Sequence, residues 1–270
     1  MKYKTFAVIG KPIEHSLSPL LHSISFELMG IRAWYTKVEV GKEELGEFMR
    51  TAPKLFTGIN VTIPLKEEVT KYLDEVRGVA REVGAVNTVK FEGGKAIGYN
   101  TDVEGVRKAV STQIEPKGLR VAIIGAGGAA RAAVVAFYKD NEVTIFNRTE
   151  ERGRKLAEEF GVEFQPLSNY ELIKEFDLVV NATPVGLGGR GVPIPPEALR
   201  EGQVVMDMVY NPLLTPLLRN ALLKGCKVVD GLKMLVIQGL ESEVIWLGLA
   251  PTWEKVYSKL LAKLAQNREN

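Results

Sequence analysis

Cysteine and histidine are scarce in this sequence of 270 residues, and each scarcity narrows the possible chemistry. The single cysteine, Cys226, cannot form an intramolecular disulfide, which favours a reducing compartment. We expect a small buried residue there rather than a reactive thiol. His15 and His22 are the only histidines, and no cysteine or further histidine surrounds them. The sequence therefore offers no adequate ligand set for a dedicated metal site.

Charge of one sign and long apolar runs are also lacking. Thirty-five Lys and Arg against 33 Asp and Glu leave a net charge of +2, too small to predict a nucleic-acid or membrane surface. No apolar run approaches the ~18 residues of a membrane span, and the apolar part of residues 1–10 is too short for a signal peptide. We expect a cytoplasmic protein with a small-molecule partner, without nucleic acid or membrane, and a monomer or homodimer.

Alternating strand and helix patterns fill most of the chain. An apolar fraction of 46% is typical of a globular protein, and the length suits two domains. Residues 5–77 alternate between the two patterns, and residues 85–99 predict a β-hairpin around a turn at 92–95. Between 120 and 230, short β-branched strands alternate regularly with helices, which predicts a parallel sheet covered on both faces. The helical stretch from 234 to 265 is expected to pack back on the first domain.

A glycine-rich turn directly follows the predicted strand at 120–124 and precedes a predicted helix. It fits the pattern GxGxxA and consists of Gly125, Ala126, Gly127, Gly128 and Ala129. Glycines at such a turn allow the backbone to approach a pyrophosphate, whose charge the helix N-terminus favours. The turn therefore predicts a dinucleotide site, although a glycine-rich turn can also serve an α/β fold without a ligand.

The end of the next strand predicts which dinucleotide binds. An enzyme that uses NAD(H) usually places an acidic residue here for the ribose hydroxyl, whereas this chain has Asn147, Arg148 and Thr149, with Arg152 one turn further on. These donors suit a 2′-phosphate and favour NADP(H). The alternative is that both arginines only face water.

Lys66 lies at the predicted junction between a strand and a helix, in the segment NVTIPLK at residues 60–66. Pro64 suits the first turn of a helix predicted over 65–73, and Lys66 is either a functional side chain held at a fixed edge or a solvated lysine. Hydride transfer to a carbonyl needs a proton donor, and lysine, tyrosine and carboxylate remain as candidates. Lys66 and Asp102 are the simplest choice for the proton-transfer pair, because each follows a strand of the N-terminal part and both can therefore lie at one edge facing the cofactor.

Several motifs together resemble the shikimate dehydrogenase family. They run in order through nearly the whole chain: HSLSP at 15–19, NVTIPLK at 60–66, GAVNTV at 84–89, NTD at 100–102, GAGGAAR at 125–131, NRT at 147–149, NATPVGL at 181–187 and MLVIQG at 234–239. The resemblance implies NADPH-dependent reduction of 3-dehydroshikimate to shikimate, in aromatic amino-acid (chorismate) biosynthesis. It also implies that Lys66 and Asp102 are the catalytic pair.

The same resemblance implies a set of binding residues. Ser16 and Ser18 would hold the substrate carboxylate, although Ser18 before Pro19 also has the pattern of a helix N-cap. The remaining substrate ligands would be Asn60, Thr62, Asn87, Gln238 and Tyr210. The nicotinamide half of the cofactor would be approached by Thr183, Met208, Gly231 and Met234. The methionines could instead fill the core.

We therefore expect a two-domain α/β protein. Residues 1–101 and 232–270 would form a discontinuous substrate-binding and catalytic domain, and residues 102–231 a Rossmann-like NADP-binding domain, with the active site in the cleft between them. Two rivals stay open. One is a quinate/shikimate dehydrogenase that accepts NAD, since Glu150 and Glu151 follow the arginine. The other is a non-catalytic sensor of shikimate-like acids, which the presence of Lys66 and Asp102 disfavours.

Overall fold

The computed structural model describes residues 3–269, and the side chains of residues 3–266. The chain forms two compact units, each with its own six-stranded sheet. Unit 1 contains the described residues up to Thr101 and from Val236 onwards, and unit 2 contains Asp102–Leu235. The chain passes between the units after Thr101 and again within a long helix, α8 (Gly231–Leu247).

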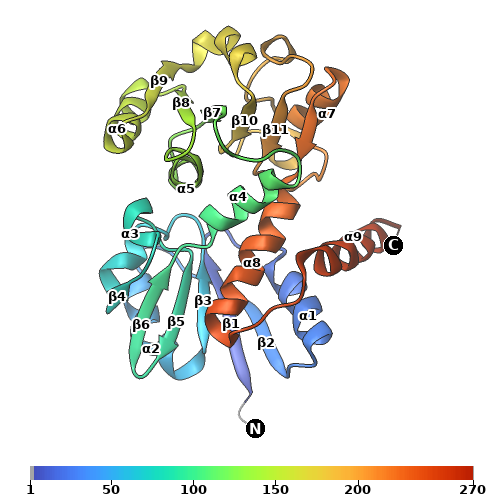
Figure 1. Ribbon diagram of the computed structural model, residues 1–270. Helices are drawn as coiled ribbons and strands as arrows, with labels where there is room; N and C mark the ends of the chain where they lie inside the picture. The colour runs from blue at the N-terminus through green and yellow to red at the C-terminus, as the bar shows by residue number, and fades with distance from the viewer. Residues whose placement is uncertain (1–2, 270) are drawn as a thin grey trace. The chain divides into compact units, whose positions relative to one another are not determined.

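Unit 1 is a mixed sheet with helices on both faces (Figure 1). Its strands are β1 (Lys4–Gly10), β2 (Ala33–Glu39), β3 (Gly58–Val61), β4 (Glu75–Val76), β5 (Thr88–Glu92) and β6 (Lys95–Tyr99), in the order β2-β1-β3-β5-β6-β4. Its helices are α1 (Ser18–Met29), α2 (Leu45–Leu55), the 3₁₀ helix η1 (Glu68–Tyr72), α3 (Ala80–Val83), α9 (Trp253–Glu269) and the C-terminal part of α8.

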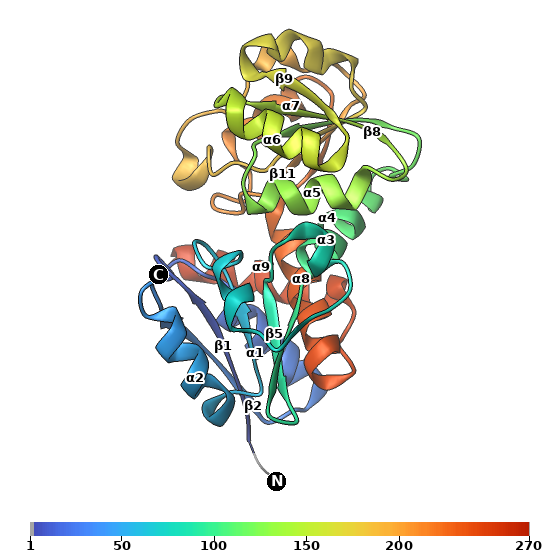
Figure 2. The same cartoon turned by 90° about the vertical axis from the view of Figure 1, so that its left-hand side faces the viewer.

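Alternate side chains of β1 build two cores on opposite faces of this sheet. Phe6 and Val8 pack with α1 and Trp246 of α8, whereas Ala7 and Ile9 pack with α2 and β3. The period-2 geometry of a strand causes this division. Figure 2 shows α2 lying over the face of the sheet next to β1. The C-terminal helix α9 packs on α1, which confirms that the chain returns to the first domain.

Local predictions in unit 1 were mostly confirmed. Strands β5 and β6 pair antiparallel around Gly93 and Gly94, whose φ angles are 60° and 76°, so the hairpin has the left-handed turn residues it needs. The helix predicted over 65–73 was wrong. Leu65 instead closes a turn by donating its N–H to the carbonyl of Thr62 at 2.9 Å, and a short 3₁₀ helix follows at Glu68. The Ile63–Pro64 peptide is cis.

Unit 2 is a parallel sheet, as the regular alternation predicted. Its strands are β7 (Arg120–Ile124), β8 (Glu142–Asn147), β9 (Glu163–Pro166), β10 (Leu178–Asn181), β11 (Val204–Asp207) and β12 (Lys227–Val229). Its helices are α4 (Asp102–Ser111), α5 (Gly128–Phe137), α6 (Glu150–Phe160), α7 (Pro216–Leu223) and the N-terminal part of α8, with 3₁₀ helices η2 (Leu167–Glu175), η3 (Leu187–Gly189) and η4 (Pro196–Ala198).

The strand order in unit 2 identifies the type of α/β fold to which this sheet belongs. It runs β12-β11-β10-β7-β8-β9, which becomes 3-2-1-4-5-6 when the six strands are numbered along the chain and read from β9. This is the order of the doubly wound Rossmann fold, and its ligand crevice lies at the carboxyl ends of the first and fourth strands. Here these strands are β7 and β10. The short edge strand β9 was not predicted, because its EFQP sequence is too polar and too short for a strand pattern.

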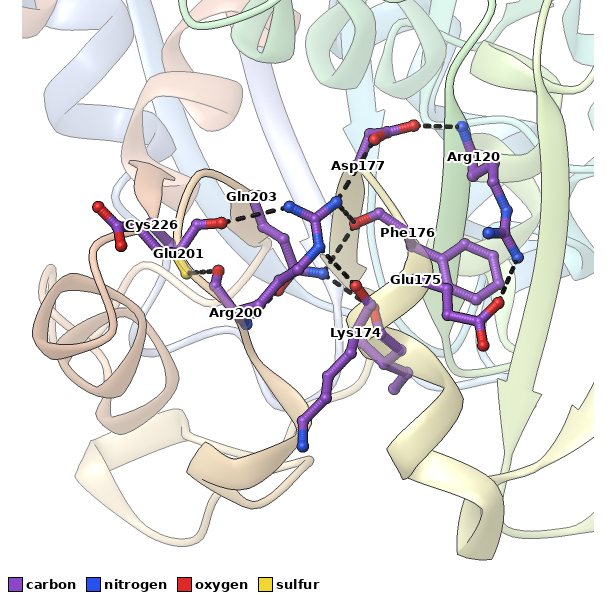
Figure 3. A network of polar contacts seen from close by, with 10 residues as sticks. Arg120, Lys174, Glu175, Phe176, Asp177, Arg200, Glu201, Gln203 and Cys226 are labelled. Atoms are coloured by element: carbon purple, nitrogen blue, oxygen red, sulfur yellow. Dashed lines mark hydrogen bonds and ion pairs between the residues drawn. The ribbon is translucent and has the colours of Figure 1, made fainter.

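A polar network ties the loops of unit 2 together beside the last strands (Figure 3). The Arg200 guanidinium donates from Nε to the carbonyl of Lys174 at 2.6 Å and lies 3.6 Å from the Asp177 carboxylate. The Cys226 thiol donates to the carbonyl of Arg200 at 3.2 Å, and burial raises its pKa. Cys226 is therefore a small buried residue, as predicted, and its raised pKa makes it a poor nucleophile.

The described residues contain neither a membrane-spanning helix nor a cluster of metal ligands. Among residues 3–269, no helix is both long and apolar enough to cross a bilayer. Among the side chains of residues 3–266, no three of the His, Cys, Asp or Glu type converge on a point where a metal ion could bind.

Candidate functional site

The crevice of unit 2 begins at Gly125, immediately after β7. Its φ angle of 119° favours glycine, and a Cβ atom there would lie 3.0 Å from Cγ2 of Thr183, which follows β10. Its N–H donates to the carbonyl of Phe146 in β8 at 2.9 Å. Gly125 is therefore the point where the backbones after β7 and β10 approach closely.

The next two glycines leave open space at the start of α5. A Cβ atom at Gly127 or Gly128 would meet no atom within 4 Å, so these glycines are not required by packing. Gly127 is the N-cap residue of α5 and makes no side-chain cap, and Ala126 and Ala129 are half-buried beside it. Unpaired N–H groups at a helix N-terminus favour an anion. The turn therefore fits a bound pyrophosphate.

The arginines after β8 are exposed and available to a ligand. Among the side chains and carbonyls of residues 3–266, none forms a hydrogen bond or ion pair with the Arg148 or Arg152 guanidinium. By contrast, Arg154 on the same helix pairs with Glu150 at 3.0 Å. The Asn147 side chain donates to the carbonyl of Thr149 at 2.7 Å and shapes the loop. These contacts leave two cationic donors at the strand end that was predicted to recognise a 2′-phosphate.

The carboxyl end of β10 is held by a buried carboxylate. Asn181 donates to Oδ1 of Asp207 at 2.9 Å and accepts at its own Oδ1 from the Thr183 hydroxyl at 2.7 Å. Asp207 also accepts from the Thr215 hydroxyl at 2.6 Å and from the N–H of Val209 at 3.0 Å. Burial raises the pKa of Asp207, although these donors oppose the rise. Asp207 was not predicted as a site residue, because its only signal in the sequence is an acidic residue at the end of a buried strand.

The remaining cofactor candidates follow β11 and begin α8. Gly231 lies against the backbone here, since a Cβ atom would be 2.6 Å from the carbonyl oxygen of Met208. Met208 is half-buried, as is Tyr210, and Met234 is buried. Gly231 is thus explained by close backbone packing, and nothing in its surroundings requires a ligand.

In unit 1, the ends of β1 and β3 lie beside one another. A Cβ atom at Gly10 would be 2.5 Å from Cγ2 of Thr62, so only glycine permits this approach. Lys66 is half-buried in the loop after β3, and its carbonyl accepts from the N–H of Val86 at 2.8 Å. This loop is therefore anchored to the segment that leads to Asn87.

Asn87 lies at the centre of a buried polar cluster. Its Oδ1 accepts from the N–H of Thr101 at 2.8 Å, and its Nδ2 donates to the Thr101 hydroxyl at 2.9 Å and to Oε1 of Gln238 at 3.2 Å. The backbone N–H of Thr101 can only donate, so it fixes which end of the Asn87 amide accepts. Three segments, β5, the exit of β6 and α8, thus meet at one amide.

Asn60 is bound entirely by protein groups in this structure. Its Nδ2 donates to the carbonyl of Asn87 at 3.1 Å and to the hydroxyls of Thr88 and Ser242 at 3.1 and 3.0 Å, and its Oδ1 accepts from the Tyr35 hydroxyl at 2.6 Å. Three of these partners were not predicted from the sequence: Tyr35, Thr88 and Ser242. Ser242 could have been found, because it lies four residues after Gln238 on the same face of α8.

The loop before α1, which contains Ser16 and Ser18, does not support the alternative that Ser18 caps the helix. The N-cap of α1 is Leu17, which makes no side-chain cap, so Ser18 is not the capping residue. Instead, the Ser16 hydroxyl accepts from the N–H of Ser18 at 3.3 Å, and Ser18 is buried.

Asp102 is also buried, and it is the first residue of α4. A carboxylate is favoured at that helix end.

The two polar sites define a class of protein before any relative is considered. A doubly wound sheet with a glycine-rich turn at its switch point is a dinucleotide-binding architecture. Unit 1 adds a separate cluster of amides and hydroxyls. Together they are typical of an α/β oxidoreductase with a polar small-molecule substrate.

Comparison with known proteins supplies the family. A family model described as "Shikimate dehydrogenase substrate binding domain" matches residues 8–89, and another, "Shikimate / quinate 5-dehydrogenase", matches residues 108–186. The NADP(+) shikimate dehydrogenase of Ignicoccus hospitalis is 57% identical over 260 residues, covering 96% of this chain and 99% of that protein. The enzyme of the same name from Thermococcus kodakarensis is 46% identical, covering 92% of both chains.

Solved structures of similar proteins point to the same family. The crystal structure of shikimate 5-dehydrogenase from Thermus thermophilus in complex with NADP(H) and shikimate has a TM-score of 0.91 and 38% identity, covering 96% of this chain and 99% of that chain. The chain belongs to the shikimate dehydrogenase family.

Proposed function

We propose that this protein is an NADP-dependent oxidoreductase that catalyses the reversible reduction of 3-dehydroshikimate to shikimate, a step of chorismate and aromatic amino-acid biosynthesis. The observation that carries the proposal is the junction of Asn87, Thr101 and Gln238, which presents fixed amides and a hydroxyl in one place. A polyhydroxylated acid needs such a set of oriented donors and acceptors. The relatives that cover nearly the whole chain support the same activity.

Lys66 and Asp102 are assigned to the proton chemistry. When bound, NADPH supplies the hydride, so the carbonyl oxygen must gain one proton to become the hydroxyl of shikimate. The Lys66 ammonium donates that proton, and the same group receives it in the oxidation direction. Asp102, buried at the start of α4, orients the reacting oxygen and balances the ammonium charge. This division of roles is testable by variants of each residue.

The substrate groups are divided according to their chemistry. Ser16 and Ser18 donate to the substrate carboxylate, while Asn87, Gln238 and Thr62 hold the ring hydroxyls. Tyr210 is the remaining residue that we assign to the substrate. Asn60 is assigned the role of orienting Asn87, because its Nδ2 donates to the Thr88 hydroxyl, which in turn donates to Oδ1 of Asn87.

The cofactor groups follow the crevice of unit 2. The open turn at Gly127 and Gly128 receives the pyrophosphate, and Arg148 with Arg152 holds the 2′-phosphate, which favours NADP(H) over NAD(H). Asn147 and Thr149 shape the loop that presents these arginines. Thr183, Met208, Gly231 and Met234 line the nicotinamide side.

The function is tested by following the reduced nicotinamide while purified protein meets shikimate with NADP⁺, then with NAD⁺, with quinate in parallel. Strong turnover with shikimate and NADP⁺ alone is expected. Comparable rates with quinate or NAD⁺ would replace the proposal with a quinate/shikimate dehydrogenase. Binding of shikimate without turnover would replace it with a sensor.

The proposal extends to the setting of the enzyme. We expect a monomer or a homodimer in the cytoplasm that takes a small-molecule substrate and binds no nucleic acid. The single cysteine in the sequence supports a reducing compartment. Light scattering after size-exclusion chromatography measures the mass, and a tetramer or larger species would contradict this expectation.

A further inference from the structure

Tyr35 connects two of the proposed substrate groups, although it was not predicted to have a role. It lies on β2, with 8% of its surface exposed. Its hydroxyl donates to Oδ1 of Asn60 at 2.6 Å, and the nearby Ser18 side chain lowers the pKa of the same phenol. The Tyr35 hydroxyl therefore bonds to the amide cluster around Asn87 and has Ser18 of the loop before α1 near it.

The phenol of Tyr35 is a permanent donor. Burial raises its pKa well above the usual value, and the charge of Glu243 adds to the rise, so the proton stays on the oxygen at any physiological pH. A group that always donates must face the oxygen end of an amide. Asn60 is therefore held with Oδ1 towards Tyr35 and Nδ2 towards Thr88 and Ser242.

This orientation is passed on to the groups proposed to bind substrate. The Thr88 hydroxyl accepts from Asn60 and donates to Oδ1 of Asn87 at 3.0 Å. The Nδ2 of Asn87 then donates to Oε1 of Gln238 at 3.2 Å, which makes the amide nitrogen the donor end of that side chain. Every hydrogen bond from Tyr35 to Gln238 thus runs in one direction.

The Tyr35 ring is itself held by a buried histidine and carboxylate. The His22 ring stacks on it with centroids 4.2 Å apart and planes inclined by 14°. His22 Nδ1 lies 2.6 Å from Oε1 of Glu243, and the Ser25 hydroxyl donates to the other carboxylate oxygen. His22, Ser25 and Glu243 are all at most 1% exposed. The ring consequently has one position rather than a range of positions.

We propose that Tyr35 is a positioning residue for substrate binding, which holds the Asn60 amide and, through Asn60 and Thr88, supports the directions of the Asn87 and Gln238 amides that the Thr101 N–H also constrains. The inference rests on the proposed function for the identity of the ligand, a polyhydroxylated carboxylic acid. A purely structural residue at this position would contribute packing and stability alone. A positioning residue also sets the affinity for shikimate, and this difference separates the two roles.

The test compares Tyr35→Phe with a matched control, Tyr72→Phe. Both variants lose one hydroxyl from unit 1, but Tyr72 is 43% exposed and lies in η1. Phenylalanine keeps the ring that stacks on His22. Calorimetric Kd and kinetic KM for shikimate are expected to rise about tenfold in Tyr35→Phe, with KM for NADP⁺ within about twofold of wild type. Tyr72→Phe should leave all three constants at the wild-type values.

A double variant that combines Tyr35→Phe with Asn60→Ala tests whether Tyr35 acts on shikimate binding through Asn60. Because the effect of Tyr35 passes largely through Asn60, Tyr35→Phe should add less than about threefold to the shikimate Kd of the Asn60→Ala variant. If Tyr35→Phe does not fold, His22→Gln, which keeps a donor for Glu243 and removes the stacked ring, should give the same selective loss.

Two failures are distinguishable. Wild-type protein that does not bind shikimate would contradict the proposed function. Wild-type protein that binds shikimate, together with a Tyr35→Phe variant of unchanged Kd or one that loses shikimate and NADP⁺ affinity equally, would overturn the positioning role alone.

Discussion

The polar cluster of unit 1 and the crevice of unit 2 are built in opposite ways. Asn60 and Asn87 are buried, and protein partners occupy their hydrogen-bonding groups. In unit 2, the candidate ligands are open backbone at Gly127 and Gly128 and exposed arginines. In unit 1, the directions of the amide side chains are fixed before a ligand binds. In unit 2, positively charged side chains and open space beside the backbone remain available to a ligand.

This difference follows from the ligands proposed for each unit. A small rigid acid with several hydroxyls is distinguished by the directions of its donors and acceptors, so the protein gains by orienting its amides in advance. A dinucleotide carries several negative charges on a flexible chain, and backbone N–H groups and guanidinium groups recognise it without a rigid pocket. Variants in unit 1 should therefore alter substrate handling, and variants in unit 2 should alter cofactor handling.

The largest expected effect is at Lys66. Lys66→Ala should lower kcat by about 10²–10⁴-fold, because the carbonyl oxygen loses its proton donor, while the shikimate Kd changes by less than about fivefold. The control is Lys71→Ala in η1, an exposed lysine paired with Glu68 at 2.5 Å. Steady-state kinetics and calorimetry measure both quantities. Near-normal turnover in Lys66→Ala would remove its catalytic role.

Cofactor discrimination is the next largest effect. Arg148→Ala should raise KM for NADP⁺ by about 10–100-fold, since a charge-assisted hydrogen bond contributes about 1.5–3 kcal/mol, with little change for NAD⁺. Arg154→Ala is the control, because that arginine lies on α6, the helix directly after Arg148, but pairs with Glu150. Equal losses for both cofactors would remove the argument for phosphate recognition.

Two glycines of the same turn should behave differently. Gly125→Ala should destabilise the protein by at least about 1–2 kcal/mol, because its φ angle of 119° disfavours a Cβ atom and Thr183 lies in the way. Gly127→Ala has an allowed φ of −100° and open space, so it should leave the stability unchanged and weaken NADP⁺ binding. Urea unfolding and cofactor titration would measure the two effects. Equal loss of stability in both variants would contradict the division.

The smallest effect concerns Asp207 and pH. Burial raises its pKa above the usual 3.8, so the folded chain binds this proton more tightly than the unfolded chain. Its contribution to stability is therefore present below pH 3.8 and is lost as the pH rises through the raised folded value. Asp207→Asn should remove that part of the pH dependence, and its amide can still donate to Thr215 and accept from Asn181. Urea unfolding from pH 4 to 8 would show parallel curves for both proteins if the idea is wrong.

Local sequence patterns predicted the elements well where one pattern dominated. The strand at Arg120–Ile124, the helix at Glu150–Phe160 and the hairpin around Gly93 were all found. The helix over 65–73 failed because a turn closed by Leu65 and Thr62 intervenes. The N-cap alternative for Ser18 failed because Leu17 occupies that position. Both failures depend on contacts of the loop with the rest of the unit.

The sequence alone determined the fold class, and it predicted the chemistry of the cofactor crevice. A strand, a glycine-rich turn and a helix are consecutive in the chain, and the arginines follow the next strand, so local order carries this information. Only the tertiary structure decided how the unit 1 cluster is held. His22, Tyr35, Asn60 and Glu243 are separated by up to 221 residues along the chain, and each resembles an ordinary core or strand residue by itself. Their common role arises because a buried polar group requires a partner, and folding of β2, β3, α1 and α8 supplies it.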